Sequence, residues 1–590
     1  MSSFGGNQWK VIRHYLSLSN LNAEVEKLVQ RIKPATPEQW ESLIKRFEKA
    51  MSIKLSQTSI ETDQSKTLDQ TTYENTLKAT TIEETDTKTV IKDNIQKPEE
   101  KISQEGLTLG NEMKEITVEG LWRGMKLKKD LYMGKVSDQS WKSNKPAITK
   151  TSIHSRTAYV ISALVTAETA ECMQKRTDDL ISHLRSYPEC RDYAIKEGAI
   201  RALLRLQRKS QDDTPIAREV SGTIKQALAL LGYTGPTKGP GPHILAIDGG
   251  GIRGLITIEI LRHLEKLTGK RVNELFDYII GVSTGAIIAA VIGSGVGTLD
   301  TANEMYRTLS KKMFGNTSFI GGTSRLVFSH AFYDTVEWEN LLKSHLRDCT
   351  LLNCNKYDVP KMALLSCVVN TGKITPFLFR TYECGFRVRS VHPGTAHAPL
   401  WCAVRASAAA PTYFQEFSHE GLLHQDGGIM ANNPTAVGLH EAKLLFGADA
   451  LKNATIISVG NGKPLKSEIN QQLMLKGANK GATGTSWKEK FYMILESATN
   501  TEAVHQVLND SLPPGTYYRF NPPLSQECSM TEIDPAKLAD MLVDTAAYIR
   551  RNQHKFERAA AALCRQRSAL QRAADQVRYR AHLMGVTHTK

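Results

Sequence analysis

The sequence predicts an α/β fold, and two stretches of the chain carry that prediction. Residues 276–293 read as a strand, a sharp turn and a helix, because one apolar run leads into Gly-Val-Ser-Thr-Gly and a second apolar run leaves it. Residues 243–267 have the same order: a short apolar strand, three consecutive glycines, and a helix with its leucines and isoleucines on one face. A strand followed by a helix, repeated along the chain, is typical of a sheet covered by helices.

The apolar stretch from 278 to 299 also allows a second interpretation. No charged residue lies between Asp277 and Asp300, and this interval is long enough for a membrane-spanning helix. The glycines in the interval argue against a simple span, and they occupy positions 281, 285, 293, 295 and 297. We therefore expect a buried strand followed by a buried helix.

Composition limits the class of protein. A length of 590 residues leaves room for several domains and a large core. The net charge of +14 favours an anionic partner, either phospholipid headgroups or nucleic acid. The nine cysteines are scattered without a Cys-x-x-Cys pair, which predicts a reduced, intracellular chain without a zinc site.

The two ends of the sequence give expectations about targeting. No apolar segment of a signal peptide follows Met1. Residues 1–22 lack acids and carry Lys10 and Arg13, and we expect an ordinary basic terminus rather than a mitochondrial presequence. The last four residues, Thr-His-Thr-Lys, differ from the peroxisomal signal Ser-Lys-Leu.

The first 242 residues divide by composition. Residues 1–54 have the apolar spacing of a helical segment, and residues 55–118 are so polar that we expect a disordered linker. Residues 119–152 interleave basic and aromatic side chains, which suits a membrane interface, single-stranded nucleic acid or a solvated linker. Residues 153–235 resemble an armadillo-like block of helices, and we expect this block to dock on the domain that follows.

Ser283 is the candidate nucleophile. It occupies the apex of the strand–turn–helix stretch, between Gly281 and Gly285. A serine in a nucleophile elbow has a strained backbone, so only very small neighbours fit beside it. The start of a helix also provides backbone amides that favour negative charge.

The glycine-rich turn after Asp248 has two interpretations. It contains Gly249, Gly250 and Gly251, followed by Arg253. Gly-x-Gly-x-x-Gly between a strand and a helix is the context of a dinucleotide site. Consecutive glycine amides can equally form an oxyanion hole. The serine at the end of the next strand favours the oxyanion hole, because a dinucleotide fold needs no exposed serine there.

A nucleophilic serine needs a base. Asp426 stands at the end of a candidate strand, beside Gly427 and Gly428, where it could reach a neighbouring serine. A conventional triad in the order Ser, Asp, His is the alternative, and its candidates are His424, His440 and His505.

Five motifs together resemble the patatin-like phospholipases, over about residues 244–439. They are Asp-Gly-Gly-Gly-x-Arg-Gly at 248–254, Gly-Val-Ser-Thr-Gly at 281–285, Arg-Ala-Ser-Ala-Ala-Ala-Pro-Thr-Tyr-Phe at 405–414, Asp-Gly-Gly at 426–428 and Asn-Pro at 433–434. Their order and spacing match as well. The resemblance implies a catalytic domain at 243–439 with a three-layer α/β/α sandwich fold.

The resemblance also implies roles. Ser283 would be the nucleophile and Asp426 its base, in a dyad without histidine. Gly249, Gly250 and Gly251, with Arg253 nearby, would form the oxyanion hole, and Gly281, Gly285, Gly427 and Gly428 would support the motifs. The implied activity is calcium-independent hydrolysis of phospholipid acyl esters to a fatty acid and a lysophospholipid. No cofactor or metal is implied, and we expect an intracellular, membrane-associated enzyme of the mitochondrion or endoplasmic reticulum.

Residues 440–590 read as an α/β extension that ends in basic helices. From Tyr548 onward the chain has ten Lys or Arg residues and two acids, with an apolar stripe formed by Ala559 to Ala562, Leu570, Ala573 and Val577. Such a helix suits an anionic membrane surface, and the alternative is an ordinary solvated face packed on the core.

The expected partners are therefore membrane phospholipids and an anionic membrane surface, with no nucleic acid, and a homodimer is left open. Two other functions stay open as alternatives. One is a nucleotide-binding protein that uses the glycine loop, and the other is an inactive lipid-binding scaffold.

Overall fold

The computed structural model of the protein describes residues 149–210, 214–295, 297–309, 334–347, 349–411, 413–464 and 500–585. The chain divides into two compact units, Met1–Ser137 and Asp138–Lys590, and all described residues belong to the second unit. The segments predicted at 1–54 and 55–118, and nearly all of the basic aromatic segment at 119–152, lie outside the described residues.

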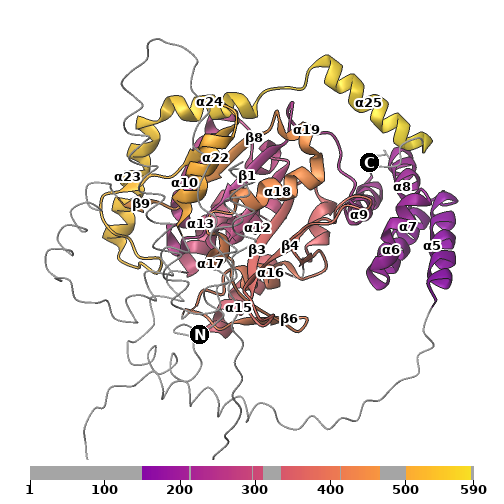
Figure 1. The fold of residues 1–590 in the computed structure, drawn as a ribbon, viewed down its shortest axis with the longest axis horizontal. Helices are drawn as coiled ribbons and strands as arrows, with labels where there is room; N and C mark the ends of the chain where they lie inside the picture. The colour runs from indigo at the N-terminus through magenta and orange to yellow at the C-terminus, as the bar shows by residue number, and fades with distance from the viewer. Residues whose placement is uncertain are drawn as a thin grey trace, which may run out of the picture. The chain divides into compact units, whose positions relative to one another are not determined.

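A nine-stranded sheet forms the centre of the second unit (Figure 1). The parallel strands carry the predicted strand–turn–helix stretches, and β3 pairs antiparallel with both β4 and β7. The strand order is β10 (Tyr517–Phe520), β8 (Thr455–Val459), β1 (His243–Ile247), β2 (Tyr278–Val282), β3 (Lys361–Val368), β4 (Thr375–Arg380) and β5 (Gly394–Thr395), with β7 (Leu422–Asp426) beside β3 and β6 (Phe417–His419) beside β7.

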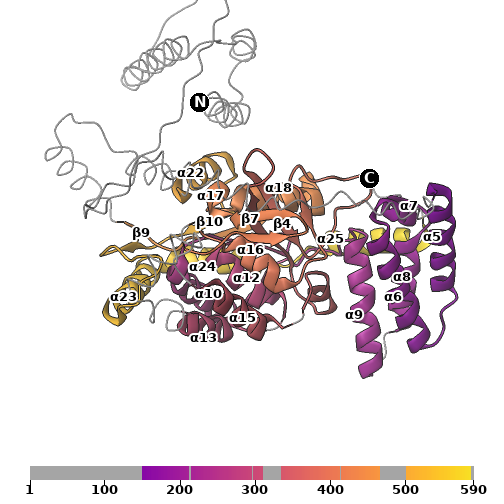
Figure 2. The same cartoon turned by 90° about the horizontal axis from the view of Figure 1, so that it is seen from below.

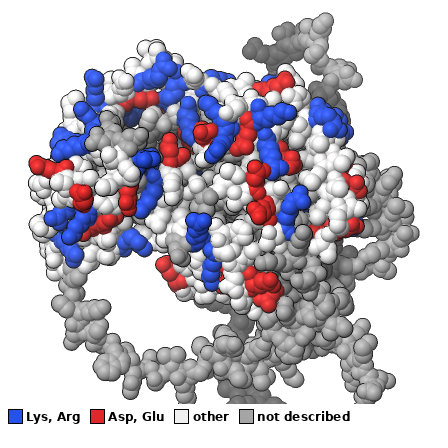
Figure 3. Space-filling model, turned by 180° about the vertical axis from the view of Figure 1, so that it is seen from behind, with Lys and Arg blue, Asp and Glu red and all other residues white. Residues whose placement is uncertain are grey.

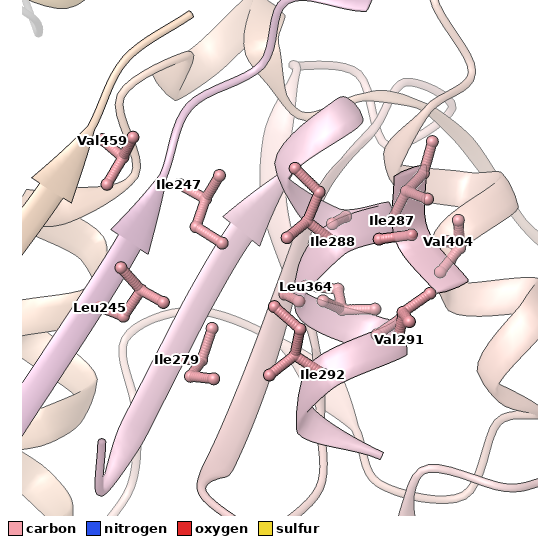
Figure 4. Close-up of a cluster of buried hydrophobic side chains, with 14 of the residues drawn as sticks. Leu245, Ile247, Ile279, Ile287, Ile288, Val291, Ile292, Leu364, Val404 and Val459 are labelled. Carbon is pink, nitrogen blue, oxygen red and sulfur yellow. The ribbon is translucent and has the colours of Figure 1, made fainter. Parts of the chain in front are cut away.

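Helices cover both faces of the sheet, because alternate strand residues point to opposite sides. On one side, Leu245, Ile247 and Ile279 of the strands pack against Ile288 and Ile292 of α12 (Figure 4). The longer helices in this core are α10 (Gly254–Thr268), α12 (Thr284–Gly293), α13 (Leu299–Leu309), α15 (Thr335–Leu346), α16 (Leu400–Ser407), α23 (Pro535–Arg551) and α24 (Gln553–Leu563). The α/β prediction is confirmed.

The second face of the sheet has its own core. Ile244 and Ala246 of β1 and Ile280 of β2 are fully buried there, against Ala442 of α18 (Thr435–Phe446). Helix α22 (Thr501–Ser511) lies beside α18 and β10. The shorter elements are η2 (Gly251–Arg253), α11 (Val272–Leu275), η4 (Leu352–Lys356), α17 (Gly428–Ala431), α19 (Ala448–Leu451), β9 (Lys463–Pro464) and β11 (Pro523–Leu524).

The apolar stretch that began as a candidate membrane span is part of this core. It forms strand β2 and helix α12, and every residue of both elements is buried. In the part of the chain that the structure describes, no helix is both long enough and apolar enough to cross a bilayer. The preferred interpretation, a buried strand followed by a buried helix, is confirmed.

A block of helices precedes the sheet in the chain (Figure 2). Threonine side chains cap three of its helices, because Thr149, Thr169 and Thr214 each accept a hydrogen bond from a backbone amide in the first turn. The block has a hydrophobic core of its own, which Leu352 of η4 joins, and α9 packs along η4. Its elements are α5 (Lys150–Val165), α6 (Ala170–Ser186), η1 (Pro188–Cys190), α7 (Arg191–Lys196), α8 (Ala199–Lys209) and α9 (Pro215–Leu230).

The C-terminal helices differ from the predicted single amphipathic stripe. The chain leaves helical geometry after α24, and Ser568 forms a capping box with Gln571 at the start of α25 (Ala569–Met584). Ala559, Ala560 and Ala562 of α24 are buried in the domain core, whereas Leu570 and Val577 of α25 are exposed. The prediction of one continuous apolar stripe was wrong, because the break between α24 and α25 places the two helices in different surroundings.

Candidate active site

The chain turns sharply at Ser283, between β2 and α12. The residue has φ 54° and ψ −120°, a conformation that costs energy for any residue with a side chain. Such an outlier persists only where the surroundings enforce it. Ser283 is therefore held at a nucleophile elbow, as its sequence context predicted.

Two glycines make this turn sterically possible. A Cβ atom on Gly281 would lie 2.3 Å from the carbonyl oxygen of Gly285, and a Cβ atom on Gly285 would lie 2.3 Å from the carbonyl oxygen of Ile247. Both approaches are to backbone atoms, which cannot move aside cheaply. The elbow thus requires glycine at both positions because backbone of β1 and of α12 occupies the space.

Helix α16 braces the elbow from the side. The backbone amide of Ser283 donates to Ser407 Oγ at 2.9 Å, and Ser407 Oγ donates to the carbonyl oxygen of Leu365 in β3 at 2.6 Å. Ser407 belongs to the Arg-Ala-Ser motif that the sequence singled out at 405–407. The structure gives that motif a physical role, since it connects the turn at Ser283 to the adjacent strand.

Asp426 ends strand β7 directly beside the elbow. Its carboxylate accepts a hydrogen bond from the Gly428 amide at 2.7 Å, and the Ser283 side chain lies near enough to lower the pKa of Asp426. The approach of β7 to β3 is close, because a Cβ atom on Gly427 would lie 2.3 Å from the carbonyl oxygen of Leu365. The structure therefore brings together the predicted nucleophile and the predicted base, which lie 143 positions apart in the chain.

The environment of Asp426 makes its carboxylate basic. The residue is 6% exposed. Burial raises the pKa of Asp426 to about 6, although the hydrogen bonds from Ser283 and Gly428 oppose that rise. A carboxylate with a raised pKa that touches a serine hydroxyl is suited to accept its proton.

The glycine loop lies against the same serine. A Cβ atom on Gly249 would come within 3.2 Å of Ser283 Cβ and within 2.3 Å of Asn432 Oδ1. Gly250 is packed against Asn461, and Gly251, with φ 61°, is packed against the carbonyl oxygen of Met530. Side chains larger than hydrogen do not fit anywhere along this loop, so its backbone can approach a reacting group closely.

Not all amides of the loop are available to a ligand. The Gly249 amide donates to the carbonyl oxygen of Asn432 at 3.1 Å, and the Ile252 amide donates to that of Met530 at 2.8 Å. Among the hydrogen bonds of the described residues, the amides of Gly250 and Gly251 have no protein acceptor. The predicted set of oxyanion donors is therefore reduced to these two glycines.

Arg253 supports the loop rather than pointing away from it. Its side chain is half-buried, and Nε donates to the carbonyl oxygen of Gly250 at 3.3 Å. This contact fixes the peptide that follows Gly250, whose amide nitrogen belongs to Gly251. Arg253 thus lies near the predicted oxyanion hole and stabilises the backbone of the glycine loop.

The histidines of the alternative triad have other partners. His424 is fully buried between Phe377 and Phe379, and its Nδ1 lies 3.0 Å from Ser366 Oγ. Burial lowers the pKa of His424 to about 4. His505 Nδ1 lies 3.2 Å from the Tyr517 hydroxyl, and the ring of His440 contacts His392. The recorded partners of these three rings do not include Ser283 or Asp426.

An arginine that sequence reasoning missed completes the neighbourhood of the loop. Arg519 of β10 forms a two-pronged ion pair with Asp248, with Nη1–Oδ1 and Nη2–Oδ2 distances of 2.9 and 2.6 Å. No motif surrounds Arg519 in the sequence. The only available signal was Asp248 itself, a carboxylate at the end of an apolar strand, which needs a partner when it is buried.

These features define a class of protein. A strained serine at an elbow, a buried carboxylate beside it and two glycine amides nearby are the features that the active centre of a serine hydrolase on an α/β sheet requires. Residues 245–439 match the family described as patatin-like phospholipase. This part of the chain is therefore similar to the patatin-like phospholipase family.

Named relatives extend beyond the matched domain. The chain is 38% identical over 434 residues to the calcium-independent phospholipase A2-gamma of Homo sapiens, covering 73% of this chain and 53% of that protein. It is 30% identical over 409 residues to phospholipase A I of Arabidopsis thaliana, covering 58% of this chain and 30% of that protein. The chain thus spans about half the length of the human relative.

Solved structures are only weakly similar overall. VipD from Legionella pneumophila is 12% identical and has a TM-score of 0.30, over 53% of this chain and 67% of that one. A likeness of this size says nothing about the reaction or the site.

Proposed function

We propose that this protein hydrolyses acyl ester bonds of membrane glycerophospholipids, releasing a fatty acid and a lysophospholipid without a need for calcium. One observation carries the proposal: the strained Ser283 lies beside the buried carboxylate of Asp426, near enough for its side chain to lower the pKa of that carboxylate. The names of the relatives, which include calcium-independent phospholipases A2, support the substrate class and the independence from calcium.

The first half of the reaction would form an acyl-enzyme. Ser283 Oγ attacks the ester carbonyl carbon while its proton passes to Asp426. The carbonyl oxygen becomes an oxyanion, which the amides of Gly250 and Gly251 stabilise. The bond to the glycerol oxygen then breaks, and Asp426 returns the proton to that oxygen, so that lysophospholipid leaves.

The second half would release the fatty acid. A water molecule gives one proton to Asp426 and attacks the acyl carbon, and the bond to Ser283 Oγ breaks. Asp426 returns the proton to Ser283, which restores the free enzyme. Both halves need one base that exchanges a proton with oxygen atoms near neutral pH, and the raised pKa of Asp426, about 6, suits that role.

The experiment that tests this function is analysis of products by mass spectrometry. Purified full-length protein is incubated with mixed phospholipid vesicles containing a calcium chelator. We expect equimolar fatty acid and lysophospholipid from the wild type and none from Ser283→Ala. Unchanged lipid, together with saturable binding of ATP or NAD, would contradict the proposal and favour the nucleotide-binding interpretation of the glycine loop.

We also propose that α25 attaches the protein to an anionic membrane. Leu570, Val577 and Met584 are 84%, 68% and 65% exposed, and their seven-residue spacing places them along one face of the helix. The opposite face holds Asp575, whose carboxylate pairs with Arg567 at 2.8 Å. The helix therefore turns its apolar stripe away from the protein.

Charge complementarity favours lipid as the partner of this stripe. Asp575 is the only acid of α25, whereas Arg572, Arg578 and Arg580 are exposed on it. Exposed arginines beside apolar side chains suit the interface of an anionic bilayer. The face drawn in Figure 3 mixes basic and acidic side chains and shows no extended surface of one sign.

Vesicle flotation tests the attachment. The variant Leu570→Ser/Val577→Ser should lose binding to anionic vesicles, because it removes the apolar contact and leaves the charges unchanged. The matched control is Val391→Ser, since Val391 is 74% exposed on a different part of the domain. Equal flotation of all three proteins would contradict the role of α25.

A further inference from the structure

Arg519 connects three strands on its way to the glycine loop. It belongs to β10, the outermost strand, and lies opposite Ser458 of β8. Its Nη1 donates to Ser458 Oγ at 2.9 Å and to Asp248 Oδ1 at the same distance. The guanidinium group therefore reaches across β8 to the end of β1, where the glycine loop begins.

Asp248 is fixed through its backbone as well as its side chain. Its amide donates to the carbonyl oxygen of Val459 at 3.0 Å, and its carbonyl oxygen accepts from Asn461 Nδ2 at 2.7 Å. Gly249, in contact with Ser283, is the next residue, and the proposed oxyanion donors Gly250 and Gly251 follow it. Any displacement of Asp248 thus shifts the amides that would receive the oxyanion.

The pair is almost completely removed from water. The side chains of Arg519 and Asp248 are 2% and 1% exposed. Burial raises the pKa of Asp248 to about 6, and the charge and hydrogen bonds of Arg519 limit that rise, so the carboxylate is ionised at neutral pH. A buried ion pair is costly to break, because removal of one partner leaves an uncompensated charge.

A third charged group holds the arginine in place. Glu502 Oε1 lies 3.4 Å from Arg519 Nη2 and accepts a hydrogen bond from Asn521 at 2.8 Å. Burial opposes ionisation of Glu502, but hydrogen bonds from Lys463 and Asn521, with the charge of Arg519, hold its pKa at about 2. The guanidinium group of Arg519 therefore contacts two carboxylates and a serine hydroxyl.

We infer that Arg519 is a positioning residue for the oxyanion hole, acting through Asp248 on the amides of Gly250 and Gly251. Arg519 lies outside the matched family domain, residues 245–439. The C-terminal extension would thus complete the active centre instead of only covering the sheet. This inference rests on the proposed function, because an oxyanion hole has a purpose only in acyl transfer.

The chemistry of arginine explains why this position needs it. A guanidinium group binds a carboxylate through two parallel N–H···O bonds and so fixes its orientation as well as its charge. A lysine at this position could supply the charge but only a single contact point. Orientation is the property that an oxyanion hole needs, since its donors must point at a developing charge.

Loss of Arg519 should affect the transition state more than substrate binding. The oxyanion exists only after attack, so misplaced amides lower kcat while KM changes little. A misplacement of about 1 Å can cost about 100-fold in rate. We therefore expect Arg519→Gln to lower kcat about 100-fold and Arg519→Lys to lower it less.

A second buried pair in the same domain provides the control. Arg380 donates to Glu441 at 2.8 and 3.1 Å and is also almost fully buried, but its recorded partners do not touch the glycine loop. Arg380→Gln should therefore lower Tm as Arg519→Gln does and leave kcat of the folded protein near that of the wild type. The double variant Asp248→Asn/Arg519→Gln should recover part of the kcat lost in Arg519→Gln, because no buried charge is left unpaired.

The experiment measures kcat, KM and Tm for the full-length variants on phospholipid vesicles. A kcat loss in Arg519→Gln with little change in KM, absent from Arg380→Gln, would support the inference. Equal kcat in these two variants, or a rise in KM alone, would overturn it. If Arg519→Gln does not fold, Arg519→Lys is judged by the same division between kcat and KM. An inactive wild type would instead count against the proposed function.

Discussion

Two buried aspartates stand at strand ends of the same sheet and differ in what surrounds them. Asp426 ends β7 and is 6% exposed, and Asp248 follows β1 and is 1% exposed. Burial raises the pKa of each to about 6. The neighbours of Asp426 are neutral, the Gly428 amide and the Ser283 side chain, whereas Asp248 accepts hydrogen bonds from the guanidinium group of Arg519.

The different partners suit the two carboxylates to different roles: Asp426 to accepting a proton, and Asp248 to holding the backbone in place. A carboxylate with neutral donors can take up a proton without leaving another charge unpaired. Protonation of a carboxylate in a buried ion pair would instead leave the charge of the arginine unpaired. The same residue type at similar burial therefore suits proton transfer at Asp426 and orientation of the backbone at Asp248.

The largest expected effect separates the two aspartates directly. Asp426→Asn keeps the size of the side chain but cannot accept the proton of Ser283, so hydrolysis should fall by about 10⁶-fold, as for loss of the base in a serine protease. Initial rates of fatty acid release measure this. The control is Tm, which should stay within a few degrees of the wild-type value. Activity near the wild-type level would remove Asp426 from the reaction.

A smaller loss of activity is expected when Asp248 is changed. Asp248→Asn removes the carboxylate that Arg519 orients but leaves Ser283 and Asp426 intact, so kcat should fall by about 100-fold through displacement of the glycine amides. Steady-state kinetics on vesicles measure kcat and KM separately. A loss as large as that of Asp426→Asn would make the two sites equivalent and break the comparison.

The pH dependence of the hydrolysis rate should reflect the ionisation of Asp426. Asp426 must be ionised to accept a proton, and its pKa is raised to about 6, so activity should fall about tenfold per pH unit below pH 6. The same raised pKa means that the folded state binds this proton more tightly than the unfolded state. Its contribution to the free energy of unfolding is therefore lost as pH rises through about 6. A rate that stays constant down to pH 4 would contradict the role of Asp426.

The smallest expected effect concerns the elbow between the two aspartates. Ser407→Ala removes the acceptor of the partly buried Ser283 amide, which should lower the free energy of unfolding by about 1–3 kcal/mol. Chemical denaturation measures this. Ser186→Ala is the control, because Ser186 is exposed on a helix and its change should stay within about 0.5 kcal/mol. Similar losses at both positions would mean that Ser407 does not brace the elbow.

Local patterns were enough to find the centre of the site. Ser283, Asp426 and the glycines 249–251 each lie in short motifs whose geometry depends on neighbours in the chain, such as the small residues around a turn. The α/β class was predictable for the same reason, because β1, β2 and their following helices are continuous apolar segments. The roles of these residues stay predictions until variants are measured.

Contacts between distant segments could not be predicted. Arg519 lies 271 positions from Asp248, and Met530 supplies the carbonyl that accepts the Ile252 amide from beyond the same strand. Strand β10 has four residues and no motif, so nothing local marked it. The alanines of α24 were predicted to form part of an exposed stripe, but they are buried in the core. Alanine is compatible with a core and with an exposed face, so the sequence did not distinguish the two.

The central claim is that Asp426, and no histidine, activates Ser283. The rate at which a fluorophosphonate labels Ser283 tests it most directly, because labelling needs the activated serine and not a bound lipid surface. We expect Asp426→Asn to slow labelling by about 10³-fold or more, while His424→Asn, His440→Gln and His505→Gln stay within a few-fold of the wild type. Wild-type labelling of Asp426→Asn, with labelling lost in one of the histidine variants, would contradict the account.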